Sequence, residues 1–228
     1  MATVLGFRDE TPRARTFRLS MPGRTPHRAG QHYVIRLTAP DGYTASRSYS
    51  VASAPSDEDE FEITVERLEE GEVSTFLHDV VEPGDELELR GPIGKFFVWD
   101  GETPALLVGG GSGVVPLMSM LRHARNTGRS DRVRLVVSVR GPDDLLFADE
   151  LPGPETTVVH TRQTLPGEAR PAGRITLEDL VPAVAGAGVG ATAYVCGSAG
   201  FCDTVTGLLT EASVAVERIK VERFGPTR

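Results

Sequence analysis

The chain has 228 residues, of which 39% are hydrophobic and 25% charged, so a packed globular core is feasible and global disorder is not expected. Its 24 basic and 32 acidic residues give a net charge of −8, which argues against binding to nucleic acid or an anionic membrane. Two cysteines, Cys196 and Cys202, are too few for a four-thiolate iron–sulfur cluster, a four-cysteine zinc site or a disulfide scaffold. This cysteine usage fits a reducing cytoplasm.

The start of the chain does not resemble a secretory signal, because Arg8, Asp9 and Glu10 interrupt its apolar residues. Two uncharged stretches, Pro104–Leu121 and Val181–Cys202, contain prolines and several glycines and are not the apolar 20-mers that cross a bilayer. We therefore expect a soluble, cytoplasmic protein without a membrane partner.

The first hundred residues predict a small antiparallel β-barrel. Short runs rich in Val, Ile, Phe, Tyr and Thr are separated by turn sequences such as Glu82-Pro-Gly-Asp85, and six strands at this spacing are typical of a barrel. A helix over Ser74–Val80, with Ser74 as its N-cap, is expected before the last strand. The expected strands are Thr3–Arg8, Arg15–Ser20, Gln31–Thr38, Ala45–Ala52, Glu60–Arg67 and Glu86–Leu89.

After Asp100–Pro104 the pattern changes to continuous apolar runs that alternate with helical patterns. Such alternation is typical of a parallel sheet covered on both faces. The expected strands are Ala105–Val108, Val133–Val139, Thr156–Val159, Ala193–Cys196 and Ile219–Val221. The expected helices are Val115–Arg125, Asp143–Leu151, Leu177–Val184 and Gly200–Ala212.

The predicted fold class is therefore two-domain, with an N-terminal antiparallel β-barrel of Greek-key type over residues 1–100 and a C-terminal α/β doubly wound parallel sheet over residues 101–228. Open parallel sheets bind ligands beyond the carboxyl ends of their strands, and crevices between domains are favoured sites for small molecules. We expect the site there.

A candidate phosphate cradle is the glycine loop, Gly109–Gly113, which lies directly between a predicted strand and a predicted helix. Glycines let the backbone approach a pyrophosphate, and the start of a helix contributes donors and positive potential. The spacing is not GxGxxG, and a glycine-rich turn without a ligand is the alternative interpretation.

A second candidate is Arg47-Ser48-Tyr49-Ser50 on a predicted barrel strand. Strand alternation places Arg47 and Tyr49 on one face and Ser48 and Ser50 on the other. An arginine next to a tyrosine could bind an anion and stack a flat ring. Taken alone, this stretch fits an ordinary amphipathic strand better.

Two further turns could bind a ligand. Free backbone N–H groups at Gly71-Glu-Val-Ser74 could hold another pyrophosphate, although simple helix capping is the alternative. The strand Ala193–Cys196 ends in Cys196 and Gly197, where ligands bind to such sheets. A buried, inert cysteine is the alternative there.

The order of these motifs along the chain resembles the ferredoxin–NADP reductase superfamily over residues 3–226. The motifs are Arg47-x-Tyr49-Ser50, Gly71-x-x-Ser74, Gly91-Pro-Ile-Gly94, the glycine loop, Cys196-Gly197 and Glu222-Arg-Phe-Gly225. The resemblance implies a barrel that binds FAD and an α/β domain that binds NAD(P)H. It implies an FAD-dependent NAD(P)H oxidoreductase that transfers hydride from NADPH to flavin and passes electrons to a separate carrier, such as ferredoxin or flavodoxin.

The resemblance also implies which residues bind the flavin. Arg47 would bind its phosphates, Tyr49 would lie against the isoalloxazine and Ser50 would hydrogen-bond near flavin N5. Backbone around Thr64–Glu66 would hold the ribityl chain, and the turn at Gly71–Ser74 the pyrophosphate. The expected FAD-binding residues are Arg47, Ser48, Tyr49, Ser50, Thr64, Val65, Glu66, Gly71, Val73 and Ser74.

For the nicotinamide nucleotide, the resemblance implies contacts with Gly110, Gly111, Ser112, Gly113, Cys196 and Gly197. Ser112 stands where relatives often have Thr. Cys196 and Gly197 would flank the nicotinamide, while Glu222 and Phe224 would lie near the other face of the flavin. The expected residues of the hydride-transfer centre are Ser50, Cys196 and Glu222, of which Ser50 and Cys196 shape the geometry without acting as acid or base.

NADPH is the expected donor, with NADH as the alternative. A 2′-phosphate calls for arginine, and Arg140 follows the second strand of the predicted parallel sheet, while Arg162 and Arg174 follow the third. Asp143 and Asp144 lie close by, which would suit the ribose hydroxyl of NADH, but they fit the start of a helix.

The chain has neither the length nor the cysteines for a plant-type [2Fe–2S] module, so a one-electron carrier is expected to be a separate molecule. The five histidines show no metal-ligand spacing, and no metal is expected. Two alternatives stay open: an NADH-dependent reductase component of an oxygenase system, and a nucleotide-binding subunit without hydride transfer.

Overall fold

The computed structural model describes residues 1–167 and 169–225, so the predicted domain end at residue 228 lies outside the described residues. The N-terminal sheet has six strands in the order β4-β3-β6-β1-β2-β5, and each hydrogen-bonded pair is antiparallel. A bridge between Val51 and Ile63 links the two outer strands and closes the barrel. The strands are β1 Ala2–Thr11, β2 Ala14–Ser20, β3 His32–Thr38, β4 Thr44–Ser50, β5 Glu60–Glu66 and β6 Glu86–Ile93.

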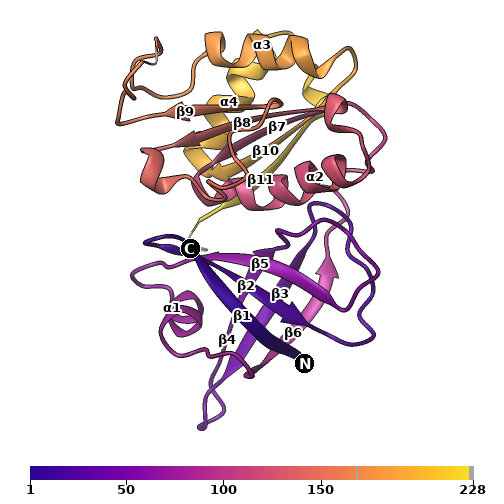
Figure 1. The fold of residues 1–228 in the computed structure, drawn as a ribbon, viewed down its shortest axis with the longest axis vertical. Helices are drawn as coiled ribbons and strands as arrows, with labels where there is room; N and C mark the ends of the chain where they lie inside the picture. Colours follow the sequence, from indigo (N-terminus) through magenta and orange to yellow (C-terminus); the bar gives the residue numbers. More distant parts are fainter. Residues whose placement is uncertain (168, 226–228) are drawn as a thin grey trace.

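Helix α1, Glu72–Asp79, packs beside the barrel against β3, β4 and β5 (Figure 1). Its buried residues Val73 and Leu77 join the barrel core, which includes Phe17, Tyr33 and Ile63. The prediction that Ser74 caps this helix is wrong, because the helix begins two residues earlier and Gly71 is the N-cap.

The C-terminal sheet has five parallel strands in the order β11-β10-β7-β8-β9. This arrangement confirms the predicted two-domain fold class. The strands are β7 Ala105–Gly110, β8 Val133–Val139, β9 Thr156–His160, β10 Thr192–Ser198 and β11 Ile219–Phe224. The helices are α2 Val114–Asn126, α3 Leu177–Ala187 and α4 Ala199–Glu211, with single 3₁₀ turns at Gly111–Gly113, Ser130–Arg132, Pro142–Asp144 and Val216–Arg218.

Helix α2 lies on the side of the sheet that faces the barrel, and α3 and α4 cover the opposite side (Figure 1). Apolar side chains of α2 and of the junction, such as Leu117, Trp99 and Phe97, form one continuous core with the sheet. The two domains therefore share a packed interface centred on α2.

The helix predicted over Asp143–Leu151 is wrong. Only Pro142–Asp144 forms a 3₁₀ turn, and the chain then packs Leu145, Leu146 and Phe147 into the core on the same side as α2. Phe147 has a φ of 58°, which an α-helix does not accommodate. The apolar residues of this segment are buried at the junction between the domains and do not form one face of a helix.

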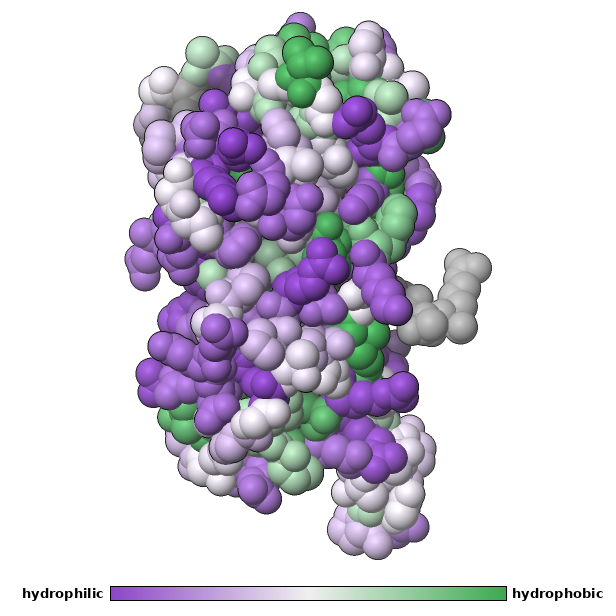
Figure 2. Space-filling view, turned by 90° about the vertical axis from the view of Figure 1, so that its right-hand side faces the viewer, coloured by the Kyte–Doolittle hydropathy of each residue, from purple (hydrophilic) through white to green (hydrophobic). Residues whose placement is uncertain are grey.

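Hydrophilic residues cover most of the face in Figure 2, and apolar residues appear there as separate spots. No helix within the described ranges is long and apolar enough to span a membrane.

Candidate functional site

The carboxyl ends of β7 and β10 form the point where the strand order of the parallel sheet reverses. From β7 the chain continues outward to β8 and β9, whereas β10 leads to β11 on the other side. Cys196 of β10 stands in register with Gly109 of β7, so the two predicted nucleotide motifs meet at this point. Open α/β sheets bind ligands at this switch point, because the two loops diverge and leave a crevice.

The glycines of this loop are packed against their neighbours. A Cβ atom on Gly113 would lie 2.2 Å from the carbonyl oxygen of Cys196, and one on Gly110 would lie 2.8 Å from the ring of Phe201. Gly111 differs, because it has a φ of +55° and no neighbouring atom within 4 Å of a Cβ position. The loop therefore needs glycine for two reasons: close approach at Gly110 and Gly113, and backbone conformation at Gly111.

Cys196 is fully buried and belongs to the core on the α2 side of the sheet. Burial raises the pKa of its thiol well above the ordinary value, so the group is neutral. A buried neutral thiol at this position contributes packing and no acid–base chemistry.

Glu222 stands beside Cys196 in the register of β10 and β11. It is partly buried, and its carboxylate makes no hydrogen bond to the described residues. Burial raises the pKa of Glu222 to about 7, which makes it a group that can hold a proton near neutral pH. Phe224, two residues on, packs against the same core.

On the barrel, the predicted flavin motif occupies β4, which pairs with β3 through Tyr33 opposite Tyr49 and Ile35 opposite Arg47. Opposed residues point to the same face, so Arg47 and Tyr49 share the face of the barrel core residues Tyr33 and Ile35. Arg47 is exposed and, within the described residues, bonds only to its neighbour's carbonyl, Ser46 O, at 2.8 Å. Its charge is available to a ligand.

The other residues of this motif differ in exposure. Tyr49 is partly buried against the barrel core, which raises its pKa, and Ser50 is buried, whereas Ser48 is exposed. Tyr43, at the turn before β4, donates to Glu72 at the start of α1 over 3.1 Å. Arg47 is close enough to oppose the rise in the pKa of Tyr43 that this bond causes. Arg47 and the start of α1 are therefore neighbours.

At the start of α1, the Ser74 hydroxyl donates to Gly71 O at 3.0 Å and accepts from the Leu68 N–H at 3.2 Å. No side chain in the described part of the chain caps this helix, so the first-turn N–H groups of Glu72, Val73 and Ser74 keep donor capacity for a ligand. Ser74 therefore stabilises the turn through hydrogen bonds to its backbone.

The β5 residues predicted to hold the ribityl chain are largely engaged with the protein. The Thr64 hydroxyl bonds to Thr16 at 2.7 Å, and His78 Nε2 bonds to the Val65 carbonyl at 2.9 Å. Glu66 is only partly buried at the end of the strand.

Arg140 and Arg162 follow the neighbouring strands β8 and β9, and the Arg162 N–H donates to Arg140 O at 2.9 Å. Both side chains and that of Arg174 are exposed and form no hydrogen bond or ion pair within the described ranges. The structure thus brings Arg140 and Arg162 together at the same edge as the glycine loop.

Phe201 is a residue of this edge that the sequence analysis missed. Its ring lies against both Gly110 and Gly197, where a Cβ atom would come within 2.8 and 2.7 Å of it. Its position in the first turn of a helix after a strand that ends in Cys196-Gly197 is the signal that could have found it.

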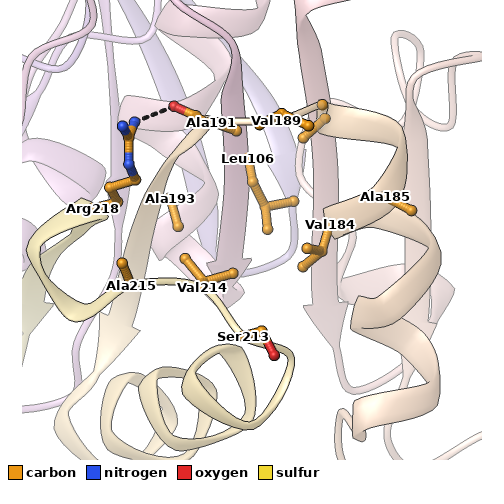
Figure 3. Close-up of a pocket in the computed structure, with 13 residues that line it drawn as sticks. Leu106, Val184, Ala185, Val189, Ala191, Ala193, Ser213, Val214, Ala215 and Arg218 are labelled. Atoms are coloured by element: carbon orange, nitrogen blue, oxygen red, sulfur yellow. Dashed lines mark hydrogen bonds between the residues drawn. The ribbon is translucent and has the colours of Figure 1, made fainter.

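A shallow pocket of about 380 Å³ lies at the opposite, amino-terminal end of the sheet (Figure 3). Leu106 and Ala193 line it from β7 and β10, Val184 from α3, and Arg218 bonds across its edge to Gly190 O. None of the predicted site residues lines it. No cluster of three or more potential metal ligands occurs in the described part of the chain.

Comparison with known proteins decides the family. Residues 8–98 match the family model of the oxidoreductase FAD-binding domain, and residues 107–206 match that of the oxidoreductase NAD-binding domain. The chain belongs to the ferredoxin–NADP reductase superfamily. Membership of this superfamily gives the barrel an FAD-binding assignment and the α/β domain a nicotinamide-nucleotide-binding one.

Three similar proteins illustrate the range of this superfamily. The FAD/NAD-binding domain of nitric oxide dioxygenase from Vibrio cholerae superposes with a TM-score of 0.81, 26% identity, and coverage of 99% of this chain and 98% of that one. NADH oxidoreductase HCR of Escherichia coli is 35% identical over 86% of this chain, and the propane 2-monooxygenase reductase component of Mycolicibacterium goodii is 29% identical over 89%. The chain spans only 59% and 60% of these two relatives' lengths.

The donor set fits the two cofactors of the superfamily. An exposed arginine beside an uncapped helix start suits a diphosphate, and a half-buried tyrosine with no hydroxyl partner in the described residues offers a flat surface. At the switch point, the glycine backbone packs against Cys196 O and the Phe201 ring, and the absence of side chains on the loop itself suits close approach by a second nucleotide.

Proposed function

We propose that this chain is an FAD-dependent NAD(P)H oxidoreductase that passes electrons to a separate carrier. The observation that carries the proposal is the pair of nucleotide cradles in one chain: Arg47 with the start of α1 on the barrel, and the glycine loop with Cys196-Gly197 at the switch point. A cofactor bound at each would bring two rings to the junction between the domains.

Bound FAD supplies the redox chemistry, because it accepts a hydride from a reduced nicotinamide and releases electrons one or two at a time. The residues of the chain would bind the two cofactors and orient their rings. Arg47 and the turn that begins at Gly71, through the N–H groups of Val73 and Ser74, would hold phosphates, Tyr49 would support a ring, and Ser50 would donate at its edge. Cys196, which is small and buried at the end of β10, would leave room at this edge for two rings to approach each other. Glu222 holds a proton near neutral pH.

NADPH is the proposed donor, because Arg140 and Arg162 are joined by a backbone hydrogen bond beyond β8 and β9, and their exposed guanidinium groups would suit a 2′-phosphate. A comparison of kcat/KM for NADPH and NADH at moderate ionic strength tests this preference. Arg140→Ala should lower the value for NADPH and leave that for NADH little changed. If NADH matches NADPH in the parent, the preference is wrong.

The carrier is proposed to be a ferredoxin, a flavodoxin or an oxygenase component. A second candidate function, the NADH-dependent reductase component of an oxygenase system, is supported by the names of relatives: the propane 2-monooxygenase reductase component and the 3-ketosteroid-9-alpha-monooxygenase ferredoxin reductase component. The nucleotide preference described above separates the two candidates.

The spectrum of the purified protein tests the proposed function. A flavin spectrum, release of FAD rather than FMN on denaturation, and anaerobic loss of flavin absorbance with NADPH or NADH are the expected results. Recovery of FMN would refute the FAD assignment. Absence of any reduction would favour a non-catalytic nucleotide-binding subunit.

A further inference from the structure

Two side chains of α2 bind consecutive backbone carbonyls of the barrel. Arg122 Nη1 donates to Ala52 O at 2.9 Å, and Ser119 Oγ donates to Ser53 O at 2.7 Å. Residues three apart lie on the same face of a helix, so both donors point to one segment of the barrel. This segment is irregular backbone between β4 and β5, and the Ser53 carbonyl also bonds to His27 Nε2 of the barrel at 3.1 Å.

Arg122 is also the centre of a charged network that crosses the junction. Its guanidinium bonds to Glu62 of β5 at 3.0 Å and to Glu150 of the α/β domain at 3.2 Å. Arg8 holds the other oxygen of Glu62 at 2.6 Å. Burial would raise the pKa of Glu62, but its bond to Arg8 and the charges of Arg8 and Arg122 lower it, so the carboxylate stays ionised.

The centre of the network, Arg122, is shielded from water, whereas Arg8 at its edge is partly exposed. The Arg122 side chain is only 13% exposed, and its guanidinium lies 5.0 Å from the centre of the Phe147 ring. The N–H of Phe147 donates to Glu10 of the barrel at 3.1 Å, so the loop after β8 is tied to the same junction. A planar, five-donor group at such a point fixes orientation as well as distance, which a lysine cannot do.

These contacts lie close in sequence to both candidate phosphate cradles. Helix α2 begins directly after the glycine loop, and Ser119 lies six residues, or roughly 9 Å, along it from Gly113. Ala52 lies two residues after Ser50. A rotation of α2 on the barrel would therefore move the nucleotide loop relative to the flavin surface.

We propose that Arg122, assisted by Ser119, is a positioning residue that fixes the distance between the two cofactor sites by holding α2 on the carbonyls of Ala52 and Ser53. The proposal rests on the proposed function for its kinetic consequence. Its structural content, the docking of α2 on the barrel, stands on the contacts alone.

Arg125 on the same helix supplies a matched control. It lies three residues after Arg122 and pairs with Glu155 at 2.7 Å and with Glu150, so its partners among the described residues lie within the α/β domain. Arg125→Lys and Arg122→Lys therefore make the same chemical change inside the domain and across the junction, respectively. Ser119→Ala removes the second contact without touching any charge.

Two readouts test the proposal on the FAD-loaded protein. The first is the rate constant of anaerobic flavin reduction at saturating NADPH or NADH, which should fall roughly tenfold in Arg122→Lys, because small displacements of reacting rings are costly. It should stay within about twofold of the parent in Arg125→Lys, with Ser119→Ala in between. FAD content and the rate of flavin photoreduction should not change.

The second readout does not depend on activity. Trp99 is the only tryptophan, and its ring lies 5.8 Å from that of His123, the neighbour of Arg122. Acrylamide should quench Trp99 fluorescence more in Arg122→Lys than in the parent, and Arg125→Lys should match the parent. Slower reduction together with a more accessible Trp99, confined to Arg122→Lys and weaker in Ser119→Ala, supports the proposal.

Any other pattern overturns the proposal, including equal effects of Arg122→Lys and Arg125→Lys. If the parent itself is not reduced by either nucleotide, the proposed function fails. In that case the Trp99 quenching alone decides whether Arg122 docks α2, and an unchanged value in Arg122→Lys overturns the docking.

Discussion

The two candidate phosphate cradles are built in opposite ways. At the start of α1, the turn is braced by one of its own side chains, Ser74, and the ligand charge must be met by Arg47 from a different strand. At the start of α2, the loop is held by backbone packing, because Gly113 lies close to the carbonyl oxygen of Cys196. The barrel site therefore depends on side chains that can be removed singly, whereas the switch-point site depends on the absence of side chains.

The difference predicts which substitutions disrupt folding and which disrupt only binding. Substitutions in the glycine loop should lower the stability of the α/β domain as well as weaken nucleotide binding. Changes at Arg47 should leave the fold intact and weaken flavin binding, because its exposed side chain is held, within the described residues, by a single hydrogen bond to the adjacent Ser46 O.

The largest effect is expected from Gly113→Ala. The new Cβ would lie 2.2 Å from a backbone oxygen that cannot move aside, so we expect a loss of about 3 kcal/mol in the free energy of unfolding. Gly111→Ala is the matched control, because open space surrounds it and only the positive φ is penalised, by about 1 kcal/mol. Urea denaturation of both variants measures the difference, and equal losses would contradict the packed-backbone account.

Arg47→Ala should weaken FAD binding without destabilising the apoprotein. Loss of one charge-assisted hydrogen bond to a phosphate costs about 1.5–3 kcal/mol, or roughly 10- to 150-fold in Kd. Arg18→Ala, which removes an exposed arginine with only a distant contact to Glu60, is the control. Fluorescence titration of the apoprotein with FAD gives both values, and a Kd unchanged in Arg47→Ala would remove this residue from the flavin site.

The smallest effect is expected for the pH dependence that Glu222 introduces. Its pKa is about 7 in the folded protein and near 4.5 when unfolded, so the folded state binds the extra proton between these values. Stability should therefore fall as pH rises from 4.5 to 7, and partial exposure limits the effect to about 1–2 kcal/mol. Glu222→Gln should flatten this part of the pH profile in denaturant melts. A profile parallel to that of the parent would show that Glu222 titrates normally.

The fold was predictable because the sequence patterns that mark its strands and helices are local. Alternating runs bounded by turns marked the six barrel strands, and apolar runs such as Val133–Val139 marked the buried parallel strands. The segment Asp143–Leu151 was misassigned because its leucines and Phe147 are buried by the junction with the barrel, a contact that no local pattern encodes. The start of α1 was misplaced because Ser74 has the chemistry of a cap but uses it from inside the helix.

The candidate site was less predictable than the fold. The glycine loop and Arg47 could be named as candidates from sequence, because a glycine-rich turn between a strand and a helix and an arginine next to a tyrosine are recognisable patterns for phosphate binding. Phe201 and Arg122 were missed, because an aromatic residue in a helix and an arginine among several on α2 have many ordinary roles. Only the three-dimensional neighbours, Gly110 for the former and Ala52 for the latter, distinguish them.

Anaerobic reduction with deuterated nucleotide tests the central claim most directly. The FAD-loaded protein is mixed with NADPH or NADH carrying hydrogen or deuterium at the transferred position, and the loss of flavin absorbance is followed by stopped flow. If the two cradles hold their rings in contact, reduction is fast with at least one nucleotide and slower with the deuterated form. A protein that retains FAD but is reduced by neither nucleotide would contradict the account.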